Sequence, residues 1–349
     1  MAESLNLVSS LPEVAVVILN WNGKHYLQQF LPSVMASTYS SLRVIVADNA
    51  STDDSVIFLN QTYPNIEIIT LPKNLGFAGG YNAALQKVNA PYYILLNSDV
   101  EVTRDWIEPM IDLLTKDDRI AACQPKILSF ANKQMFEYAG ASGGMLDLFG
   151  YPFARGRIFD SIEKDEGQYD DAIPCFWASG AALCIKAAAF HAAGGFDNVF
   201  FAHQEEIDLC WRLHKAGLQT YVVPAAVVYH VGGGTLPTGS KQKVFLNFRN
   251  NLLMMYKNLP LLQLFYILPF RLLLDAVAAY RAMFEGNSSY FFAVAKAHVF
   301  FTAFVLSGKV KRTPVTDKKV VIGGIYKGSI VWQYFIKKRR NFSEIINLK

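Results

Sequence analysis

Short apolar runs alternate with helical patterns along the first 120 residues of this 349-residue chain. Each run has the length of a single strand, and the polar stretches between them carry turn residues. We therefore predict strands at residues 14–19, 42–47, 66–70 and 92–96, with helices starting near Lys24 and spanning 77–88. Alternation of strands and helices at this spacing predicts an α/β fold with a parallel, doubly wound sheet.

The pattern is less regular between residues 121 and 244. Residues 130–172 are rich in Gly, Asp and aromatics without clear periodicity, which is typical of a long functional excursion. Helical spacing returns at 181–193 and at 205–216, where Gly217 fits a C-terminal cap. We also predict a late strand at 221–229, interrupted by Pro224.

The composition changes after residue 245, so we divide the chain into a catalytic domain (1–244) and an apolar, basic helical region (245–349). Residues 259–284 and 290–306 are apolar but interrupted by charged side chains. Because charges are costly at the centre of a bilayer, we interpret both segments as helices lying in the membrane interface. A membrane span or hairpin is the alternative.

Charge is distributed unevenly. From residue 301 onward there are eleven Lys or Arg and two acidic residues, about +9, whereas the whole chain carries only +4. A basic tail beside apolar helices suits an anionic membrane surface, and the cytoplasmic face of the plasma membrane fits it. Nucleic acid is disfavoured as a partner because no aromatic side chains are interleaved with the basic ones. The four scattered cysteines have no metal or redox spacing, and the N-terminus does not resemble a signal peptide.

Polar side chains follow three of the predicted strands. The sequence LLNSDV places Asn97, Ser98 and Asp99 after an apolar strand. In open α/β sheets, ligands bind beyond the carboxyl ends of the strands, so Asp99 could hold a divalent cation beside a diphosphate. A simple turn or helix cap is the alternative for such an isolated Asp.

Two further strand ends carry polar groups, and the same capped-turn alternative applies to them. Asp48 could accept a hydrogen bond from the imide N–H of a pyrimidine, with Asn49 and Ser51 near the ribose. A glycine-rich segment, NLGFAGGYNAAL, could bring its backbone close to a diphosphate at a helix N-terminus. It lacks the dinucleotide spacing GxGxxG. The donor-contact residues that we expect are Asn20, Asn22, Asp48, Asn49, Ser51, Asn74, Gly79, Asn82, Asn97 and Ser98.

The second half of the chain supplies candidate reactive groups. Glu205 and Glu206 begin a predicted helix after two aromatic residues, and one of them could act as a general base. Asp208 and Arg212 form an ordinary i,i+4 pair. His230 ends the late strand before a run of glycines, where it is a candidate metal ligand or a structural histidine.

A separate set of residues is expected near an acceptor. Trp177, Ser179 and Gly180 precede a predicted helix, and the indole either stacks on a sugar or packs in the core. Arg155 and Arg157 either grip phosphate oxygens or are surface cations.

Taken together, the motifs resemble family 2 glycosyltransferases of the GT-A fold over residues 12–240. The segments LNWNG, VADNASTDDS, NLGFAGGYNAAL, LLNSDV, WASGAAL and QEEIDLCWRL occur in the family's order. By this resemblance Asp48 recognises the base, and Asp99 is the last Asp of the family's DxD metal motif. Asn97 stands where that motif has its first Asp, as in rhamnosyltransferase-like members. His230 resembles the histidine that completes metal coordination.

The Glu205–Glu206 pair aligns with the family's Glu-Asp catalytic pair, with Glu206 as the base. The resemblance implies inverting transfer of a sugar, with rhamnose from a thymidine diphosphate as one candidate, from a nucleoside-diphosphate sugar to an acceptor hydroxyl. Mg²⁺ or Mn²⁺ is the implied cofactor, and a lipid-linked saccharide in surface-polysaccharide assembly is the implied acceptor. A nucleotidyltransferase and a non-catalytic nucleotide-sugar binding subunit remain as alternatives; the first would need a basic glycine-rich loop that residues 19–24 lack.

Overall fold

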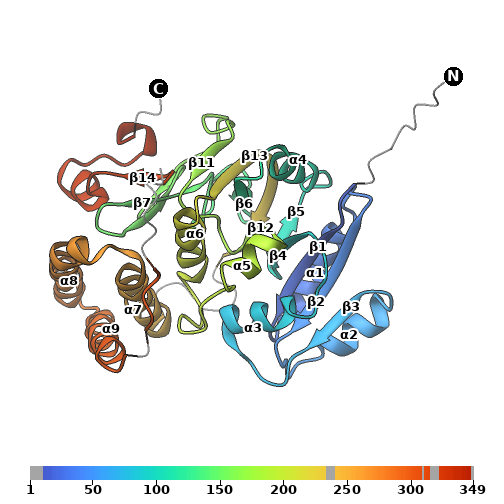
Figure 1. Ribbon diagram of the computed structural model, residues 1–349, viewed down its shortest axis with the longest axis horizontal. Helices are drawn as coiled ribbons and strands as arrows, with labels where there is room; N and C mark the ends of the chain where they lie inside the picture. Colours follow the sequence, from blue (N-terminus) through green and yellow to red (C-terminus); the bar gives the residue numbers. More distant parts are fainter. Residues whose placement is uncertain (1–10, 233–239, 309, 315–321, 347–349) are drawn as a thin grey trace.

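A nine-stranded mixed sheet lies at the centre of the protein (Figure 1). The computed structural model describes residues 11–232, 240–308, 310–314 and 322–346. The N-terminal residues tested for a signal peptide, Gly233 and Gly234, and part of the basic tail lie outside the described residues. The strands of this sheet are β1 (Val14–Asn20), β2 (Leu42–Asp48), β3 (Glu67–Thr70), β4 (Tyr92–Asn97), β5 (Val100–Val102), β6 (Ile120–Ser129), β11 (Ile173–Cys175), β12 (Ala182–Lys186) and β13 (Gln219–His230).

The sheet is mostly parallel. Its order is β11-β13-β6-β12-β4-β1-β2-β3, with β5 paired to β13. Strands β4, β1, β2 and β3 pair in parallel, as do β13 and β6, whereas β12 is antiparallel to both of its neighbours. The predicted α/β fold and its strand–helix alternation are therefore confirmed, and the parallel order is broken where β12 inserts.

Helices cover both faces of this sheet, which explains the continuous apolar sequence of β1. Ala15 and Val17 pack on one face, whereas Val14, Val16 and Ile18 pack on the other. A strand that is buried on both sides has an unbroken run of hydrophobic residues in its sequence. The helices of the domain are α1 (Lys24–Met35), α2 (Ser55–Thr62), α3 (Gly76–Leu85), α4 (Glu108–Lys116), α5 (Ala187–Ala192) and α6 (Glu205–Lys215).

One predicted element differs from the structure. Residues 181–193 form strand β12 followed by the short helix α5, not one helix. The alanines suggested a helix, but Cys184 and Ile185 are buried between β4 and β6, and this tertiary pairing outweighs propensity. The late strand is present as predicted, and Pro224 lies in its interruption, a register shift between Val223 and Val227 where no ladder bond is required.

The excursion at 130–172 forms most of a second, five-stranded sheet of order β10-β9-β8-β7-β14. Its last strand comes from the C-terminal region and pairs in parallel with β7. The side chains of Phe136, Phe153 and Phe342 fill its small core. The strands are β7 (Gly144–Asp147), β8 (Pro152–Ala154), β9 (Arg157–Ile158), β10 (Ser161–Ile162) and β14 (Ile325–Tyr326), followed by short helical turns at Trp332–Ile336 and Phe342–Glu344.

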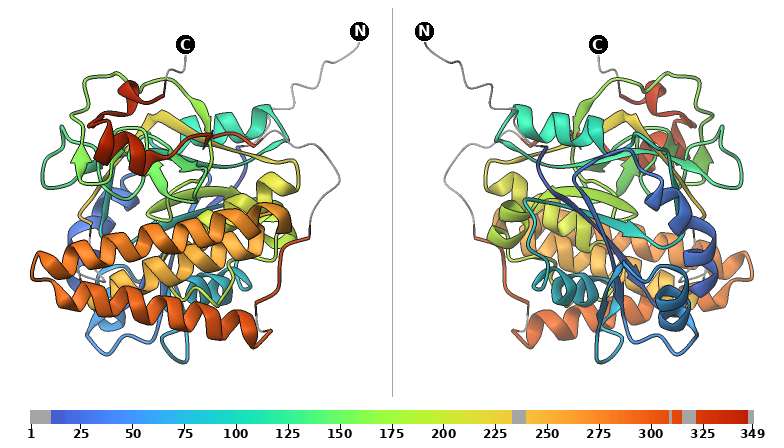
Figure 2. Two further views of the ribbon diagram at one scale, coloured as in Figure 1. Left: turned by 90° about the vertical axis from the view of Figure 1, so that its left-hand side faces the viewer. Right: turned by 90° about the vertical axis from the view of Figure 1, so that its right-hand side faces the viewer.

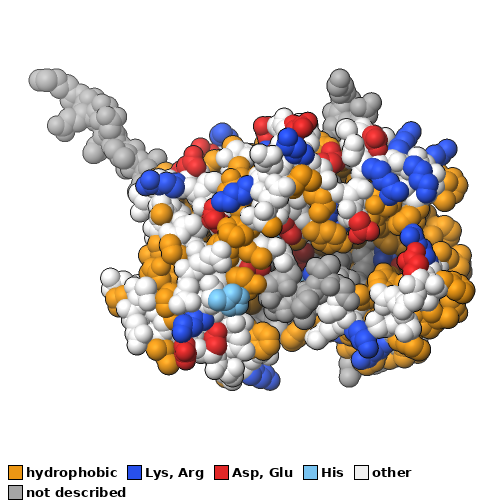
Figure 3. All heavy atoms as spheres, turned by 180° about the vertical axis from the view of Figure 1, so that it is seen from behind, with side chains coloured by type: hydrophobic (Ala, Val, Ile, Leu, Met, Phe, Trp, Pro, Cys, Tyr) orange, Lys and Arg blue, Asp and Glu red, His pale blue; other side chains and the backbone are white. Residues whose placement is uncertain are grey.

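Three long helices pack side by side against the domain (Figure 2): α7 (Lys241–Asn258), α8 (Leu261–Phe284) and α9 (Ser288–Leu306). Helices α8 and α9 are each long and apolar enough to cross a membrane by length and composition. Much of their apolar surface is exposed; Phe265 is 83% and Phe284 84% exposed. Figure 3 shows hydrophobic side chains gathered over this hairpin, with basic side chains next to it.

Candidate active site

The ends of β1 and β2 meet at one polar cluster. Asn20 lies opposite Asp48 in the parallel ladder, so both side chains reach the same edge of the sheet. The Asn20 amide donates to Asp48 Oδ1 at 3.3 Å and to Ser51 Oγ at 3.2 Å. Asp48 in turn accepts from the Ser51 backbone N–H at 3.0 Å. The structure thus brings together three of the predicted donor-contact residues.

Three asparagines fix the loops around this cluster. Asn22 accepts from the Thr52 N–H at 2.7 Å, and Asn49 accepts from the Leu75 N–H at 2.9 Å. Asn74 caps the start of α3 by accepting from the Gly76 N–H at 2.8 Å. These predicted donor-contact residues therefore use part of their hydrogen-bonding capacity to shape the strand-end loops.

The glycine-rich start of α3 differs from the prediction. The Phe77 and Ala78 amides donate to the Phe201 carbonyl at 2.8 and 3.2 Å, and Gly76 packs against the Phe201 ring. The amides expected to face a diphosphate are thus occupied by the protein's own backbone. Gly79 packs against Leu75, so the glycines serve the close approach of two loops.

Asn82 continues this connection. Its side chain accepts from the Phe196 N–H at 2.9 Å and donates to the Phe196 carbonyl at 2.7 Å and to Asn198 at 2.9 Å. The residue therefore anchors the loop that leads to α6. Its polar atoms are turned toward that loop, not toward the strand ends.

Asp99 and His230 meet where β4 passes into β5. His230 lies opposite Val100 in the β13–β5 ladder, which places its ring beside Asp99. The His230 Nε2 to Asp99 Oδ1 distance is 3.2 Å, and the amide of Asn97 lies 3.5 Å from the same ring nitrogen. Glu137 lies 3.3 Å from the other nitrogen. Burial lowers the pKa of His230, but the neighbouring carboxylates of Asp99 and Glu137 outweigh it and raise that pKa to about 10.

Sequence reasoning missed Glu137. It lies in the aperiodic excursion, where nothing distinguishes it from the neighbouring acidic residues. In the structure it is 7% exposed and orients the His230 ring. A carboxylate on the far nitrogen of a metal-ligating histidine is a common supporting arrangement.

The second group of acidic residues begins α6. Glu205 is buried and Glu206 is half-buried, and neither Oε2 atom has a hydrogen-bond partner in the part of the chain that the structure describes. Burial raises the pKa of Glu206 to about 7. Burial and the neighbouring Glu206 charge also raise the pKa of Glu205 well above its usual value. Such groups can hold or accept a proton near neutral pH.

The chain is strained just before these carboxylates. Phe201, His203 and Gln204 have φ values of 64°, 70° and 74°, in the left-handed region that non-glycine residues rarely adopt. Conformations of this kind persist only where surrounding contacts hold them, and they cluster at functional sites. The strain therefore marks the entry to α6 as a held, functional segment.

Residues Gly180 and Ala181 connect the strand end that carries Asn97 with Glu206 at the start of α6. A side chain at Gly180 would lie 3.9 Å from Glu206 Cβ, and the neighbouring Ala181 carbonyl accepts from the Asn97 N–H at 3.0 Å. Lys243, in the first turn of α7, interacts electrostatically with Glu137 and Asp99. Burial lowers the pKa of His203, and the charge of Lys243 lowers it further.

Helix α7 holds the strained segment in place. The Asn250 amide donates to the carbonyls of Phe200, Ala202 and His203 at 2.9, 2.8 and 2.7 Å. Asn251 donates to the Gln204 side chain at 3.3 Å, directly before the carboxylate pair. Helix α7 therefore supplies the contacts that a left-handed segment needs.

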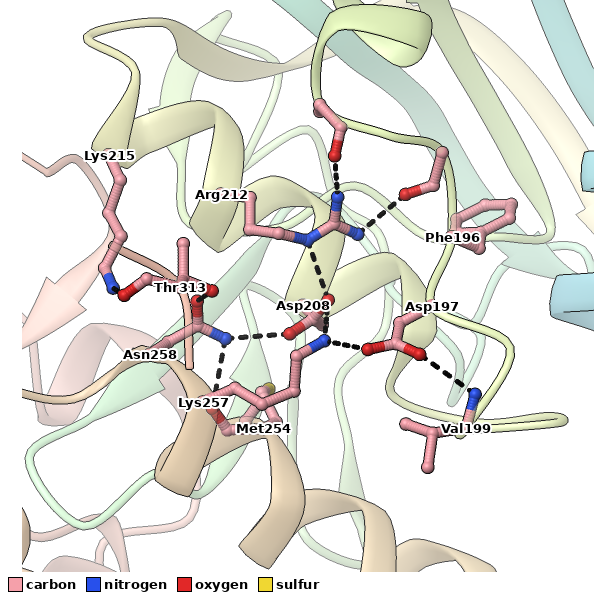
Figure 4. Close-up of polar contacts among 12 residues, drawn as sticks. Phe196, Asp197, Val199, Asp208, Arg212, Lys215, Met254, Lys257, Asn258 and Thr313 are labelled. Atoms are coloured by element: carbon pink, nitrogen blue, oxygen red, sulfur yellow. Dashed lines mark hydrogen bonds and ion pairs between the residues drawn. The ribbon is translucent and has the colours of Figure 1, made fainter. Parts of the chain in front are cut away.

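A second set of contacts joins α6 to α7 (Figure 4). Asp208 pairs with Arg212 at 2.9 Å, which confirms the i,i+4 pair predicted from the sequence. It also pairs with Lys257 at 3.0 Å and accepts from Asn258 at 2.8 Å. Lys257 reaches Asp197 in the preceding loop as well, at 2.5 Å. Asp208 is thus fully used in positioning the helix.

The hairpin is linked to the same framework. Arg271 of α8 donates to Asp275 at 2.8 Å and also to Asn251, the residue that contacts Gln204. Asp275 accepts from Tyr151 at 3.1 Å and lies 3.5 Å from His298 of α9. Arg271 and Asp275 are buried, so the polar side of α8 faces the domain while its other side is exposed and apolar.

Residues 15–173 match the family described as glycosyl transferase family 2. The chain carries a family 2 glycosyltransferase domain. The resemblance inferred from the motifs is therefore confirmed. Glu205, Glu206 and His230 lie beyond the matched residues, and their roles are proposed below.

Relatives and solved structures agree with this assignment. An N-acetylglucosaminyl-diphospho-decaprenol L-rhamnosyltransferase of Mycobacterium tuberculosis is 28% identical over 231 residues, 62% of this chain and 75% of the relative. Rhamnosyltransferase WbbL of Escherichia coli is also 28% identical, over 62% of this chain and 83% of WbbL.

Two solved structures share the GT-A fold of the glycosyltransferase domain. The mannosyltransferase PcManGT from Pyrobaculum calidifontis, in complex with GDP-Man and Mn²⁺, superposes with a TM-score of 0.52 at 16% identity. That match covers 86% of this chain and 80% of PcManGT. GalNAc-T7 with UDP, GalNAc and Mn²⁺ gives a TM-score of 0.53 at 18% identity over 68% of this chain and 48% of GalNAc-T7.

The glycosyltransferase domain buries two residues that were expected to touch an acceptor. Trp177 is 4% exposed and donates to the Met145 carbonyl at 2.9 Å, so it packs in the core. Arg155 is 1% exposed and pairs with Asp171 at 2.7 Å. Because both side chains are enclosed by protein, they support the small sheet and present no surface to a sugar.

The other residues expected near an acceptor are distributed differently. Arg157 is buried against the Tyr138 ring, 3.9 Å from the ring centroid. Ser179 donates to the Ala139 carbonyl and fixes the loop that carries Gly180. Gly180 alone of this set borders Glu206.

Asp99 and His230 could contribute to a divalent-cation site, in which the bound cation would displace the proton that His230 retains because of its raised pKa. Two ligands bound at about 2.1 Å and at right angles on one ion lie about 3 Å apart, and the pair here is separated by 3.2 Å. Among the residues that the structure describes, no group of three or more His, Cys, Asp or Glu side chains is arranged to hold a metal. Further ligands would have to come from water and the donor's phosphates, as is usual for Mg²⁺.

Proposed function

We propose that the protein is a metal-dependent, inverting glycosyltransferase that moves a sugar from a nucleoside-diphosphate donor to a hydroxyl of a lipid-linked saccharide. The observations that support this proposal are the Asp99–His230 pair, which follows the strands of a domain whose residues 15–173 match family 2 glycosyltransferases, and Glu206, which borders Gly180. Inversion requires a base on one side of the reacting carbon and charge stabilisation of the leaving group on the other.

Glu206 is the proposed general base. Among the described residues its Oε2 atom has no hydrogen-bond partner, so it is available to an acceptor hydroxyl. Burial raises its pKa to about 7, which makes it a stronger base than an exposed carboxylate and still leaves a substantial ionised fraction at neutral pH. Glu205, more deeply buried beside it, raises the proton affinity of the pair.

The strand ends are the proposed donor side. Asp48, in the cluster with Asn20 and Ser51, would accept from the base of the nucleotide. Asp99 and His230 would hold Mg²⁺ or Mn²⁺, with Glu137 orienting the histidine ring. When bound, the cation would neutralise the charge that develops on the departing diphosphate.

The acceptor and its location are inferred from the hairpin and from relatives. The exposed apolar side of α8 and α9, next to basic residues 337–340, suits a helix pair lying on an anionic membrane surface. The cytoplasmic face is proposed because nucleotide sugars are made there. Both relatives are rhamnosyltransferases, and the mycobacterial one acts on a diphospho-decaprenol-linked sugar, so a rhamnose donor and a polyprenyl-diphosphate-linked acceptor are the first candidates.

The test is turnover of a panel of nucleotide sugars by the purified full chain, read as release of nucleoside diphosphate. We expect release with one donor, a lipid-linked acceptor and Mg²⁺ or Mn²⁺, and its loss with a chelator. Glu166→Gln, at an exposed site, serves as the charge-matched control for Glu206→Gln. Turnover that is unchanged by chelation, or donor hydrolysis to nucleoside monophosphate, would contradict the proposal.

A further inference from the structure

A cavity of about 520 Å³ lies between the first turns of α7 and α9. Its walls combine two lysines, Lys241 and Lys296, with apolar and aromatic side chains. Phe245 and Phe292 form part of the wall, and Ser288 and Ser289 stand at the start of α9. A site with cationic groups on one side and aromatic groups on the other suits a ligand that is itself anionic at one end and apolar at the other.

Neither lysine of this cavity has an acidic partner among the residues that the structure describes. The Lys296 ammonium lies 5.1 Å from the Phe245 ring centroid and 5.6 Å from that of Phe300. Contacts with aromatic faces hold an ammonium in place without neutralising its charge. The charge of Lys296 therefore remains available to an anion in the cavity.

The cavity also adjoins the proposed active site. Lys241 and Lys243 are two residues apart on α7, so they point in nearly opposite directions. Lys243 faces Asp99, Glu137 and His203, whereas Lys241 lines the cavity. The two sites therefore lie on either side of one helical turn, about 10 Å across, a distance that a sugar with its diphosphate spans.

The opposite side of the cavity opens toward the apolar hairpin. Phe292, which lines it, is 67% exposed and belongs to α9, where Val299 and Leu306 are also exposed. A lipid chain leaving the cavity would thus meet an apolar surface, whereas the anionic group would remain beside the lysines. This order of active site, cations and apolar surface matches the order of groups in a prenyl-diphosphate-linked saccharide.

From this arrangement we infer that the cavity between α7 and α9 binds the diphosphate of the lipid-linked acceptor, with Lys241 and Lys296 as its ligands. The inference rests on the proposed function, because it names the acceptor's chemical class. It adds a recognition site that is separate from the donor side and from the carboxylates of α6.

The test uses the full chain in a neutral detergent, with a chelator present so that the donor side holds no cation. Farnesyl diphosphate, farnesol and inorganic diphosphate are the probes, and calorimetry gives the affinity. We expect farnesyl diphosphate to bind more tightly than either fragment. Lys296→Gln and Lys241→Gln should each weaken it by about tenfold, the effect of one lost charged contact. Lys87→Gln, an exposed lysine elsewhere, is the matched control and should bind like the wild type.

Three outcomes would overturn the inference: unchanged affinity in both cavity variants, an equal loss in Lys87→Gln, or full displacement of the probe by phosphatidylglycerol vesicles. The last would assign the cavity to bilayer headgroups. In the transfer reaction the variants should raise KM for the lipid acceptor and leave KM for the donor unchanged. If no nucleotide sugar is turned over but prenyl diphosphate still binds at the lysines, the proposed function fails and the binding site stands.

Discussion

The two halves of the candidate site are built in different ways. The strand-end half, with Asn20, Asp48 and Asp99, sits directly after buried strands, and its hydrogen bonds join neighbouring loops. The α6 half, with Glu205 and Glu206, follows a strained segment held by side chains of α7. The first half is positioned by the sheet itself, and the second depends on a helix that packs against the apolar hairpin.

This difference implies that damage to the C-terminal helices should reach Glu206 before it reaches the donor side. Arg271 contacts Asn251, and Asn251 contacts Gln204, so the route from the hairpin to the carboxylates is short. Changes at the strand ends should instead act on donor binding and leave α6 in place.

The largest expected effect is on stability, from breaking the buried pair of α8. Arg271→Met leaves Asp275 buried without its main partner and should lower the free energy of unfolding by about 3–5 kcal/mol, measured by urea denaturation. Arg281→Met is the matched control, because Arg281 pairs with Glu285 at the same 2.8 Å on the same helix but at the surface. Its effect on the free energy of unfolding should be much smaller, because solvent screens an exposed ion pair. Equal losses would show that the buried pair does not stabilise the junction.

The next effect is on turnover, from releasing the strained segment. Asn250→Ala removes three donated hydrogen bonds to loop carbonyls and should lower kcat by about a hundredfold through misplacement of Glu206. Donor affinity should stay within about twofold because the strand ends are untouched. Asn247→Ala, on the same helix without such contacts, is the control. A larger loss in donor affinity than in kcat would contradict the separation of the two halves.

The pH dependence of kcat gives a smaller, graded effect. Because burial raises the pKa of Glu206 to about 7, the ionised base is lost as pH falls, and kcat should drop about tenfold per pH unit below that value. The raised pKa also means that the folded state holds protons that the unfolded state releases. Stability should therefore fall as pH rises from about 4.5 to about 7, and Glu206→Gln should reduce this slope. A flat kcat profile between pH 5 and 8 would exclude Glu206 as the base.

The smallest effect concerns the membrane surface. Neutralising Lys337 and Lys338 should weaken binding to anionic vesicles by about 1 kcal/mol per charge, with the difference disappearing at high salt. Lys87→Gln, an exposed lysine of the catalytic domain, should bind vesicles like the wild type. Sedimentation with vesicles of neutral and anionic lipid measures the binding of both variants. Equal weakening by Lys87→Gln would indicate a nonspecific charge effect.

The strand-end half was readable in the sequence because each strand is a buried apolar run followed at once by polar residues. Asp48 and Asp99 were found in this way, and the structure places both at the expected edge. The role of α7 in holding the strained segment could not be predicted from the sequence. Asn250 and Asn251 look like ordinary polar positions of a helix, and their hydrogen-bond partners are about 50 residues away in the chain. The same holds for Glu137, which only the fold brings to His230.

The incorrect predictions have one physical cause. Residues 181–193 and the glycines of α3 were interpreted from local preference, whereas tertiary contacts decide both. The alanine-rich strand is enclosed by two neighbours, and the α3 amides meet the Phe201 carbonyl from a segment more than 100 residues later in the chain. The sequence left two interpretations of Trp177, stacking on a sugar or packing in the core, and the burial of its side chain shows that it packs in the core.

The most direct test compares Glu206→Gln with Asp99→Asn in two assays, metal-dependent donor binding and sugar transfer under saturating donor. If Glu206 supplies the base and Asp99 the cation site, Glu206→Gln binds donor like the wild type and loses transfer by about 10²–10⁴-fold, whereas Asp99→Asn loses metal-dependent binding. Transfer by Glu206→Gln at the wild-type rate would contradict the account.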